Sequence, residues 1–134
     1  MGKLNIIVSI TSAYEQKLRE VYITSIEGLL AVCATKKGRA TVAAKTGIPD
    51  NLILKWANHA DLNRIKGIGG DYAELLEAAG ILTVEDLTKR DAETLAQELR
   101  ELNNAKRIVK KLPTLRQSTA WVSIAQAIPK VMQY

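Results

Sequence analysis

Residues 62–87 read LNRIKGIGGDYAELLEAAGILTVEDL, and the turn in the middle of this stretch decides the fold. Gly67 and Gly69 flank one apolar residue, Ile68. Glycine adopts a positive φ without steric penalty, so this arrangement predicts a tight turn that points Ile68 into a core. The whole stretch predicts a short helix, a turn, a second helix and the start of a third.

Helices are predicted on both sides of the turn. Leu62 and Ile65 are spaced to share one face of a short helix that ends before Lys66. Gly80 is predicted to stop the helix after the turn, and Thr83 is predicted to be the N-cap of the next one. The helix between them is marked by apolar residues at helical spacing: Tyr72, Leu75, Leu76 and Ala79.

The order apolar residue, any residue, Gly, apolar residue, Gly, then an amphipathic helix resembles a helix-hairpin-helix motif. In DNA-binding proteins with this motif, backbone N–H groups at the start of the second helix face a phosphate. Lys66 and Arg64 favour phosphate binding here, at Lys66, Gly67 and Gly69. Asp71 favours a purely structural turn, because its carboxylate satisfies the helix dipole from within. Both interpretations remain open.

The chain repeats itself at a spacing of 58 residues. Ser9-Ile10-Thr11 stands where the second copy has Gly67-Ile68-Gly69, so the first turn is predicted without its glycines, with Ser and Thr as simple caps. Seven of the 24 residues from 7 to 30 are identical to the residue 58 positions later: Ile7/Ile65, Ile10/Ile68, Tyr14/Tyr72, Leu18/Leu76, Ile23/Ile81, Glu27/Glu85 and Leu29/Leu87.

Further helices are predicted in both halves. The run TKKGRATVAAKTG, residues 35–47, predicts a helix that ends at Gly47, and the next helix carries Trp56 inward. In the second half, Asp91 is the predicted N-cap of one helix, and a Thr114-x-x-Gln117 capping box opens another, with Trp121 inward. The two tryptophans are 65 residues apart, so about seven extra residues are predicted within the segment NAKRIVKKLP.

These patterns predict an all-α protein with two tandem helix-hairpin-helix units of four or five short helices each, packed as one compact body. The first unit, residues 1–60, is degenerate, and the second, residues 61–134, holds the Gly67-Ile68-Gly69 hairpin. The composition agrees with this prediction. The chain has no Phe and two Trp, so its core must be aliphatic, and its low content of three Pro favours helices.

Composition also limits the setting of the protein. The longest apolar run is far below the roughly 18 residues that a membrane span needs. The N-terminal sequence MGKLNIIVSI lacks the features of a signal peptide, and the single cysteine, Cys33, excludes an intramolecular disulfide. We therefore expect a cytoplasmic protein without a membrane partner.

The net charge of +5 mildly favours an anionic partner, and its distribution is uneven. Residues 1–60 carry eight Lys/Arg and four Asp/Glu, residues 61–101 carry five and ten, and residues 102–134 carry six and none. The hairpin motif therefore lies in the acidic section. The candidate phosphate-binding cations flank it.

Two basic clusters are candidates for nucleic-acid contact. Cations at a helix N-terminus oppose the dipole, which gives the first cluster a mild functional indication against a solvated turn. The second is predicted to form a stripe along one side of a helix, either as a solvated face or as an anion-binding surface. The first comprises Lys36, Lys37, Gly38 and Arg39, and the second Lys106, Arg107, Lys110 and Lys111.

Catalysis and metal binding have little support in the sequence. His59 is the single histidine and Cys33 the single cysteine, so no zinc ligand set exists. Cys33 lies in the run LLAVCA and is predicted to pack as a small hydrophobe, and His59 is predicted to be a loop or cap residue. We expect no enzyme activity, no catalytic residue, no cofactor, no metal and no small-molecule substrate.

The run from Ile26 to Ala127 is similar, nearly throughout, to an uncharacterised prokaryotic family of tandem helix-hairpin-helix proteins, classed as a domain of unknown function. Among the motifs that carry the resemblance are Thr46-Gly47-Ile48, Thr83-Val84-Glu85-Asp86-Leu87 and Leu112-Pro113. The wider superfamily implies binding of DNA backbone without sequence specificity or, in several members, protein–protein contact.

Two functions follow as expectations. The first is non-enzymatic binding of DNA or RNA backbone without sequence specificity, through the two basic clusters and the Lys66–Gly69 turn. The alternative is a protein-interaction or self-association module with no nucleic-acid role, which the separation of acidic and basic sections favours.

Overall fold

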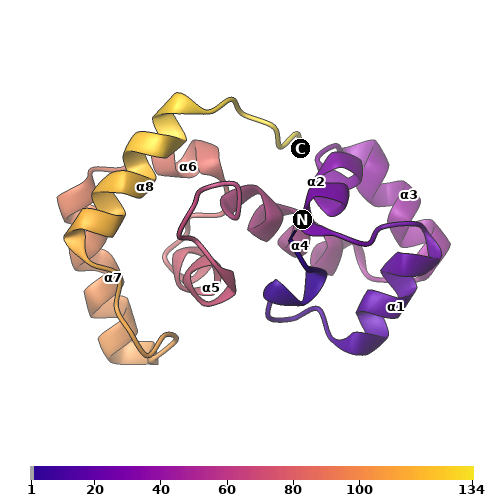
Figure 1. The fold of residues 1–134 in the computed structure, drawn as a ribbon, viewed down its shortest axis with the longest axis horizontal. Helices are drawn as coiled ribbons and strands as arrows, with labels where there is room; N and C mark the ends of the chain where they lie inside the picture. The colour runs from indigo at the N-terminus through magenta and orange to yellow at the C-terminus, as the bar shows by residue number, and fades with distance from the viewer. Residues whose placement is uncertain (1) are drawn as a thin grey trace. The chain divides into compact units, whose positions relative to one another are not determined.

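A computed structural model describes residues 2–134, and this part of the chain is all-α, as predicted (Figure 1). Met1, the first residue of the predicted unit 1–60, lies outside the described residues. No strand occurs in the described range. The elements in chain order are η1 (Leu4–Ile6), α1 (Ser12–Glu20), α2 (Ile26–Cys33), α3 (Lys36–Thr46), α4 (Asp50–Leu62), α5 (Gly70–Ala78), α6 (Val84–Thr88), α7 (Ala92–Lys106) and α8 (Leu115–Ala127).

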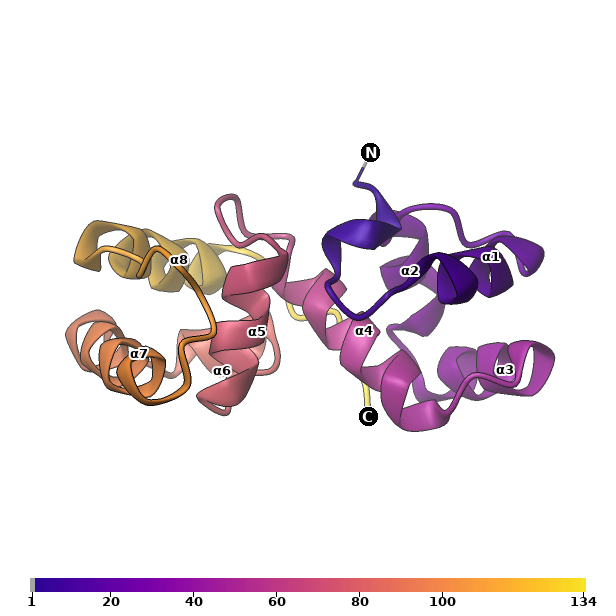
Figure 2. The ribbon, with the colours of Figure 1, turned by 90° about the horizontal axis from the view of Figure 1, so that it is seen from below.

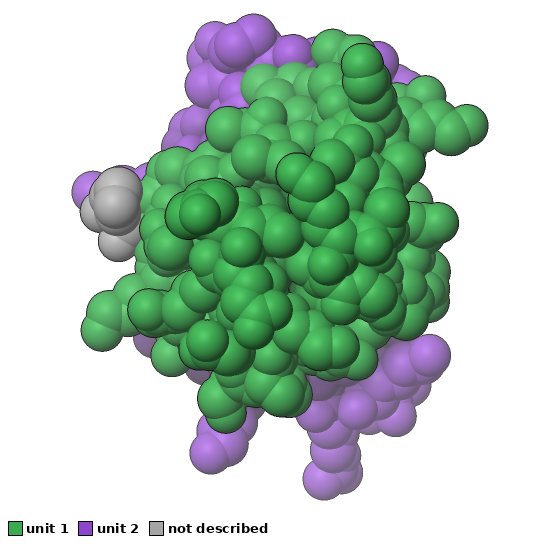
Figure 3. Space-filling view, turned by 90° about the vertical axis from the view of Figure 1, so that its right-hand side faces the viewer, with its two compact units in different colours: residues 1–61, 131–134 green, residues 62–130 purple. Residues whose placement is uncertain are grey.

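The chain forms two compact units, coloured green and purple in Figure 3. Unit 1 comprises the chain up to Asp61 together with Val131–Tyr134, and unit 2 comprises Leu62–Lys130. The division predicted from the sequence falls one residue earlier, and that prediction assigns Val131–Tyr134 to the second unit. The return of the last four residues to unit 1 is a non-local feature that the repeat does not contain.

Unit 1 has an aliphatic core built around one tryptophan. Trp56 of α4 is fully buried, and the ring of Tyr14 meets it edge-on, with 5.1 Å between ring centroids. Met132 from the C-terminal segment is 2% exposed and belongs to the same core. The predicted inward orientation of Trp56 is therefore confirmed.

Unit 2 has a second core of the same kind. Helix α8 packs against α6 and α7, which lie beside it in Figure 1. Trp121 of α8 is 1% exposed and lies 5.3 Å from the ring of Tyr72, measured between centroids. Its inward orientation is confirmed as well.

Four of the predicted helix ends in unit 2 are confirmed. Thr83, Asp91 and Thr114 each accept a hydrogen bond from a backbone N–H in the first turn of the helix that follows. Thr114 and Gln117 form the predicted capping box. Gly80 adopts a φ of +83° just after α5, which is the left-handed conformation that ends many helices.

Two predictions around residue 60 are wrong. No separate helix spans residues 62–66, because α4 continues from Asp50 to Leu62 before the chain turns. His59 is consequently not a loop or cap residue but a helical one, and it is 1% exposed. Neither Gly nor Pro interrupts the chain between Pro49 and Gly67, so nothing stops α4 earlier.

Several backbone hydrogen bonds of unit 1 have a counterpart 58 residues later. Ile7 N–H donates to the Leu4 carbonyl at 3.1 Å, as Ile65 N–H does to Leu62 at 3.1 Å. Helices α1 and α5 match at this spacing, and α4 and α8 match at a spacing of 65. The loop before α4 spans residues 47–49 and the loop before α8 spans residues 107–114, so the longer connection carries most of the difference.

Candidate nucleic-acid interface

The hairpin of unit 2 has the predicted buried apex. Ile68 is 2% exposed, and its N–H donates to the Ile65 carbonyl at 3.1 Å. Asn63 Nδ2 donates to the Ile68 carbonyl at 3.0 Å, which closes the turn. Gly67 has a φ of +98°, whereas Gly69 has a φ of −91° that any residue can adopt. One of the two glycines, not both, is therefore required by backbone conformation.

Packing also favours glycine at position 67. A Cβ atom at this position would lie 3.3 Å from Nε1 of the buried Trp121. This separation is tighter than ordinary van der Waals contact. A side chain here would therefore press on the tryptophan around which unit 2 is built, in addition to straining the backbone.

Helix α5 starts differently from the helices around it. Gly69 is its N-cap and provides no side-chain hydrogen bond. The first N–H groups of a helix have no partner within it, so those of Gly70, Asp71 and Tyr72 lack a side-chain cap. Six other helices are capped by a side chain: α1, α2, α3, α6, α7 and α8, by Thr11, Ser25, Thr35, Thr83, Asp91 and Thr114.

The second basic cluster does not form the predicted helical stripe. Helix α7 ends at Lys106, and Arg107 is its C-cap, with a φ of +50° in the left-handed region. The Asn103 side chain, in the last turn of α7, bonds to the backbone of the loop that follows. Its Nδ2 donates to the Val109 carbonyl at 3.1 Å, and its Oδ1 accepts from Val109 N–H at 2.9 Å. Lys110 and the other cations of the cluster lie at a helix end and on a loop instead, all exposed.

The loop 107–114 lies beside α5. The hydroxyl of Tyr72, in the first turn of α5, donates to the Lys111 carbonyl at 2.9 Å. Figure 2 shows this loop, drawn in orange, passing beside α5 between α7 and α8. Unit 2 therefore holds the backbone of Lys111 against the Tyr72 side chain of α5, a contact that the sequence pattern did not indicate.

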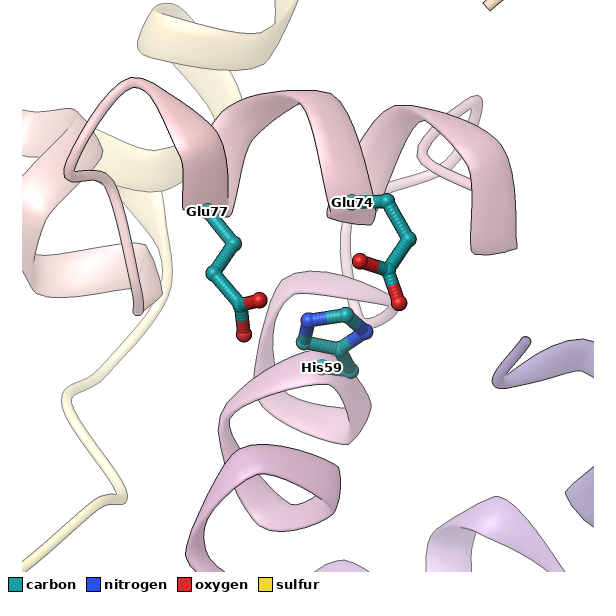
Figure 4. A group of neighbouring side chains, drawn as sticks. All are labelled: His59, Glu74 and Glu77. Atoms are coloured by element: carbon teal, nitrogen blue, oxygen red, sulfur yellow. The ribbon is translucent and has the colours of Figure 1, made fainter. Parts of the chain in front are cut away.

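Acidic residues share helix α5 with these groups. Asp71 is exposed in its first turn. Glu74 and Glu77 lie one turn apart on the same side of α5, as Figure 4 shows; the figure also marks His59 on α4. These carboxylates lower the positive potential near the hairpin, as the charge tally of the sequence indicated.

The first basic cluster separates into exposed and structural residues. Lys36 and Lys37 are exposed in the first turn of α3. Gly38 is needed for packing, because a Cβ atom there would lie 1.8 Å from the Val32 carbonyl oxygen. Its N–H donates to Thr35 Oγ1 at 3.0 Å. The glycine among these cations thus has a steric cause.

Arg39 is buried, contrary to the expectation that it offers its charge to a phosphate. The residue is 6% exposed. Its Nη1 donates to the carbonyls of Cys33 at 2.9 Å and Ala34 at 3.1 Å, and its Nη2 donates to the Gln133 carbonyl at 2.8 Å. The Tyr134 ring centroid lies 5.7 Å from the guanidinium carbon. Arg39 fastens the C-terminal segment to unit 1 and is not part of an exposed basic surface.

Cys33 packs as predicted. The residue is fully buried, and this burial raises the pKa of its thiol to about 11, partly opposed by the nearby charge of Arg39. The thiol is therefore protonated at neutral pH. It is poorly suited to nucleophilic chemistry or metal binding, since both use the thiolate.

None of the helices in the described residues is long and apolar enough to cross a membrane.

Comparison with known proteins places the chain in a family but gives no structural relative. No solved structure matches the chain significantly. The family model described as a domain of unknown function (DUF4332) matches residues 8–128, which is most of the sequence. The chain belongs to this family.

Proposed function

We propose that the two units are diverged copies of one helix-hairpin-helix unit, and that the protein binds nucleic-acid backbone without sequence specificity through unit 2. The proposed contact surface is defined as the Lys66–Gly69 turn, the first turn of α5 and the exposed cations of residues 106–111. This role is a binding role and not an enzymatic one.

The uncapped start of α5 beside the loop 107–114 is the observation that carries the proposal. Backbone N–H groups at a helix N-terminus, together with the helix dipole, favour an anion. Gly69 leaves those groups without a side-chain cap. The Tyr72–Lys111 hydrogen bond holds the basic loop next to them. We infer that the exposed lysine side chains of this loop reach a phosphate bound at the helix start.

Backbone binding of this kind has a measurable salt dependence. Each neutralised phosphate adds about 0.9 to the slope of log affinity against log salt for duplex DNA. Phosphate contacts position a protein without reading sequence. We therefore expect two duplexes of unrelated sequence to bind equally, with affinity that falls steeply as salt is added.

The test is fluorescence anisotropy with labelled 20-base-pair duplexes over a range of salt concentrations. The variant combines Lys66→Ala, Lys110→Ala and Lys111→Ala, and the matched control combines Lys17→Ala, Lys37→Ala and Lys45→Ala, which are exposed lysines of unit 1. Both variants lose three charges. We expect the first to lower the slope by roughly 2 to 3 and the control to lower it by much less. Absence of binding at low salt, or equal losses, would remove the proposal.

A second function, a protein-interaction module, is favoured by apolar residues on the unit 1 hairpin. Ile6 is 40% exposed and Val8 is 56% exposed. They stand 58 residues before Arg64 and Lys66, so unit 1 has apolar side chains where unit 2 has cations. Light scattering over a range of concentrations tests self-association. A strict monomer that Ile6→Ser and Val8→Ser leave unchanged would count against it.

A further inference from the structure

Unit 1 contains a pocket that the proposed nucleic-acid surface does not use. The pocket has a volume of about 420 Å³ and lies between the first turns of α3 and α4. Arg39, Leu54 and Tyr134 line it, and Lys36 and Asp50 contribute charged groups. Its walls are mostly apolar, and its volume lies in the range of small-molecule sites.

The positive charge of Arg39 lacks a carboxylate partner. Its contacts within the described residues are three backbone carbonyls and the Tyr134 ring. A guanidinium has five N–H donors, so two of them have no acceptor in the described part of the protein. Asp50 lines the same pocket, yet no ion pair joins it to Arg39. Among the side chains that line the pocket, Lys36 and Arg39 carry a positive charge and Asp50 a negative one, so their summed charge is positive.

The remaining walls indicate the kind of anion that fits. Lys36, at the exposed first turn of α3, adds a second cation. Leu54 and the Tyr134 ring provide apolar surface, and the Tyr134 hydroxyl is held by Asn58 Oδ1 at 2.9 Å. An aromatic group packs well on such a ring. The pocket thus combines an anion-binding end with an aromatic wall.

We propose that this pocket binds a small aromatic anion, in which a carboxylate or phosphate group contacts Arg39 and Lys36 and the ring lies against Leu54 and Tyr134. The inference does not depend on nucleic-acid binding, because it uses residues of unit 1 alone. It also gives the buried Arg39 a role besides fastening residues 133 and 134.

The test uses NMR of the full-length, ¹⁵N-labelled protein, including its arginine Nε–H signals. Phenyl phosphate and benzoate are the two ligand probes, and they distinguish the phosphate form of the anion from the carboxylate form. Inorganic phosphate and phenol are the matched controls, since each carries only half of the proposed chemistry. We expect saturable shifts at Arg39 and Tyr134 with at least one ligand probe, and weaker binding of both controls.

Variants assign the response to this pocket. Lys36→Ala should weaken binding about threefold or more, while Lys37→Ala, a neighbour that does not line the pocket, should leave it unchanged. Asp50→Asn should tighten binding, because it removes the negative charge in the pocket. Arg39 is left intact because its loss would threaten the fold.

Three outcomes would overturn the proposal. The first is the absence of saturable shifts with phenyl phosphate and with benzoate. The second is equal loss of affinity in Lys36→Ala and Lys37→Ala, which would indicate general attraction to surface charge. The third is equal affinity for inorganic phosphate and phenyl phosphate, which would show that Leu54 and Tyr134 do not bind the aromatic ring.

Discussion

The two hairpins make the same turn with different residues, and the tryptophan beneath each shows how. In unit 1, Trp56 Nε1 donates to Ser9 Oγ at 2.8 Å. In unit 2, Gly67 occupies the position of Ser9 and lies directly against Trp121, with a positive φ. A side-chain hydrogen bond in one unit thus replaces a close backbone approach in the other. The missing glycines of unit 1 therefore do not mean a missing turn.

The helices that follow the hairpins differ in the same sense. Thr11 caps α1 with its side chain, whereas Gly69 leaves α5 uncapped. The residues just after these helices also differ, since Tyr22 follows α1 with a φ of +65° and Gly80 follows α5 with a φ of +83°. In both units the N–H of this residue donates to the carbonyl three residues earlier at 2.9 Å. At these two positions unit 1 has a capping threonine and a tyrosine with a positive φ, whereas unit 2 has glycines.

The largest expected loss of stability comes from replacing Gly38 of unit 1 with the threonine found at the corresponding helix position of unit 2. Counted from the N-cap, Gly38 of α3 corresponds to Thr94 of α7, because each donates its N–H to the cap. Gly38→Thr should destabilise unit 1 by roughly 3 kcal/mol or more, since its Cβ meets the Val32 carbonyl. Thr94→Gly, the reciprocal change at an exposed site, should lower stability far less. Denaturant unfolding of both variants measures the difference, and similar losses would contradict the steric explanation.

Cys33 and Asp91 are 58 residues apart, and their pKa values shift in opposite directions. Burial raises the pKa of Cys33 from 9.0 to about 11, so the unfolded chain releases the thiol proton first. The contribution of Cys33 to stability is therefore present below pH 9 and lost as pH rises toward 11, by up to about 2 kcal/mol. Unfolding of Cys33→Ala over this pH range should show a shallower decline than the parent protein.

Asp91 should act at the other end of the pH scale. Hydrogen bonds from the Thr94 backbone and hydroxyl lower its pKa. The stabilisation is present above the ordinary pKa of an aspartate and is lost as pH falls through the lowered value. Asp91→Ala should remove this acid-side dependence and leave the alkaline decline unchanged. An unaltered acid limb in Asp91→Ala would refute the role of the cap.

Exchange of the turn residues should have a smaller effect. Gly67→Ser should destabilise unit 2 by roughly 1 to 2 kcal/mol, because serine is strained at this positive φ and its Cβ presses on Trp121. Ser9→Gly should weaken unit 1 by about 1 kcal/mol through loss of the Trp56 hydrogen bond. If Gly67→Ser left the midpoint of denaturant unfolding unchanged, the close approach to Trp121 would not explain why glycine occupies this position.

The smallest expected effect is a gain. Tyr22 is 92% exposed, so its side chain loses little packing when removed. Tyr22→Gly should stabilise unit 1 by about 0.5 to 1 kcal/mol through relief of the positive φ. Gly80→Ala should destabilise unit 2 by a similar amount. Thermal unfolding measures both, and a loss of stability in Tyr22→Gly would show that the tyrosine ring makes contacts that outweigh the strain.

Local features of the fold could be predicted from the sequence because their causes are local. Thr83, Asp91 and Thr114 lie next to the helices they cap, and Gly80 ends α5 by its own conformation. The positions of Ile68 and the tryptophans followed from periodicity. Each of these predictions depended on residues only a few positions apart.

Features with distant partners were missed. Arg39 is buried because its acceptors include the Gln133 carbonyl, 94 residues away. The basic residues 106–111 were expected on a helix because their spacing is helical, but the Asn103 side chain competes for the backbone at Val109. Asn side chains commonly do this near helix ends, so the residue pair Asn103-Asn104 was the signal that could have been used.

The central claim is that the uncapped start of α5 contacts a phosphate, and Gly69→Thr tests it most directly. The change gives α5 the same N-cap residue as α1, where Thr11 is the cap. The backbone of Gly69 is extended, and no neighbouring atom lies within 4 Å of the new Cβ. The variant should therefore be as stable as the parent protein or slightly more stable. The threonine hydroxyl accepts a hydrogen bond from the first turn of α5, which makes that N–H unavailable to a phosphate. We predict duplex affinity lowered severalfold at fixed salt, and no change for Thr11→Gly. Undiminished affinity in a folded Gly69→Thr protein would contradict the account.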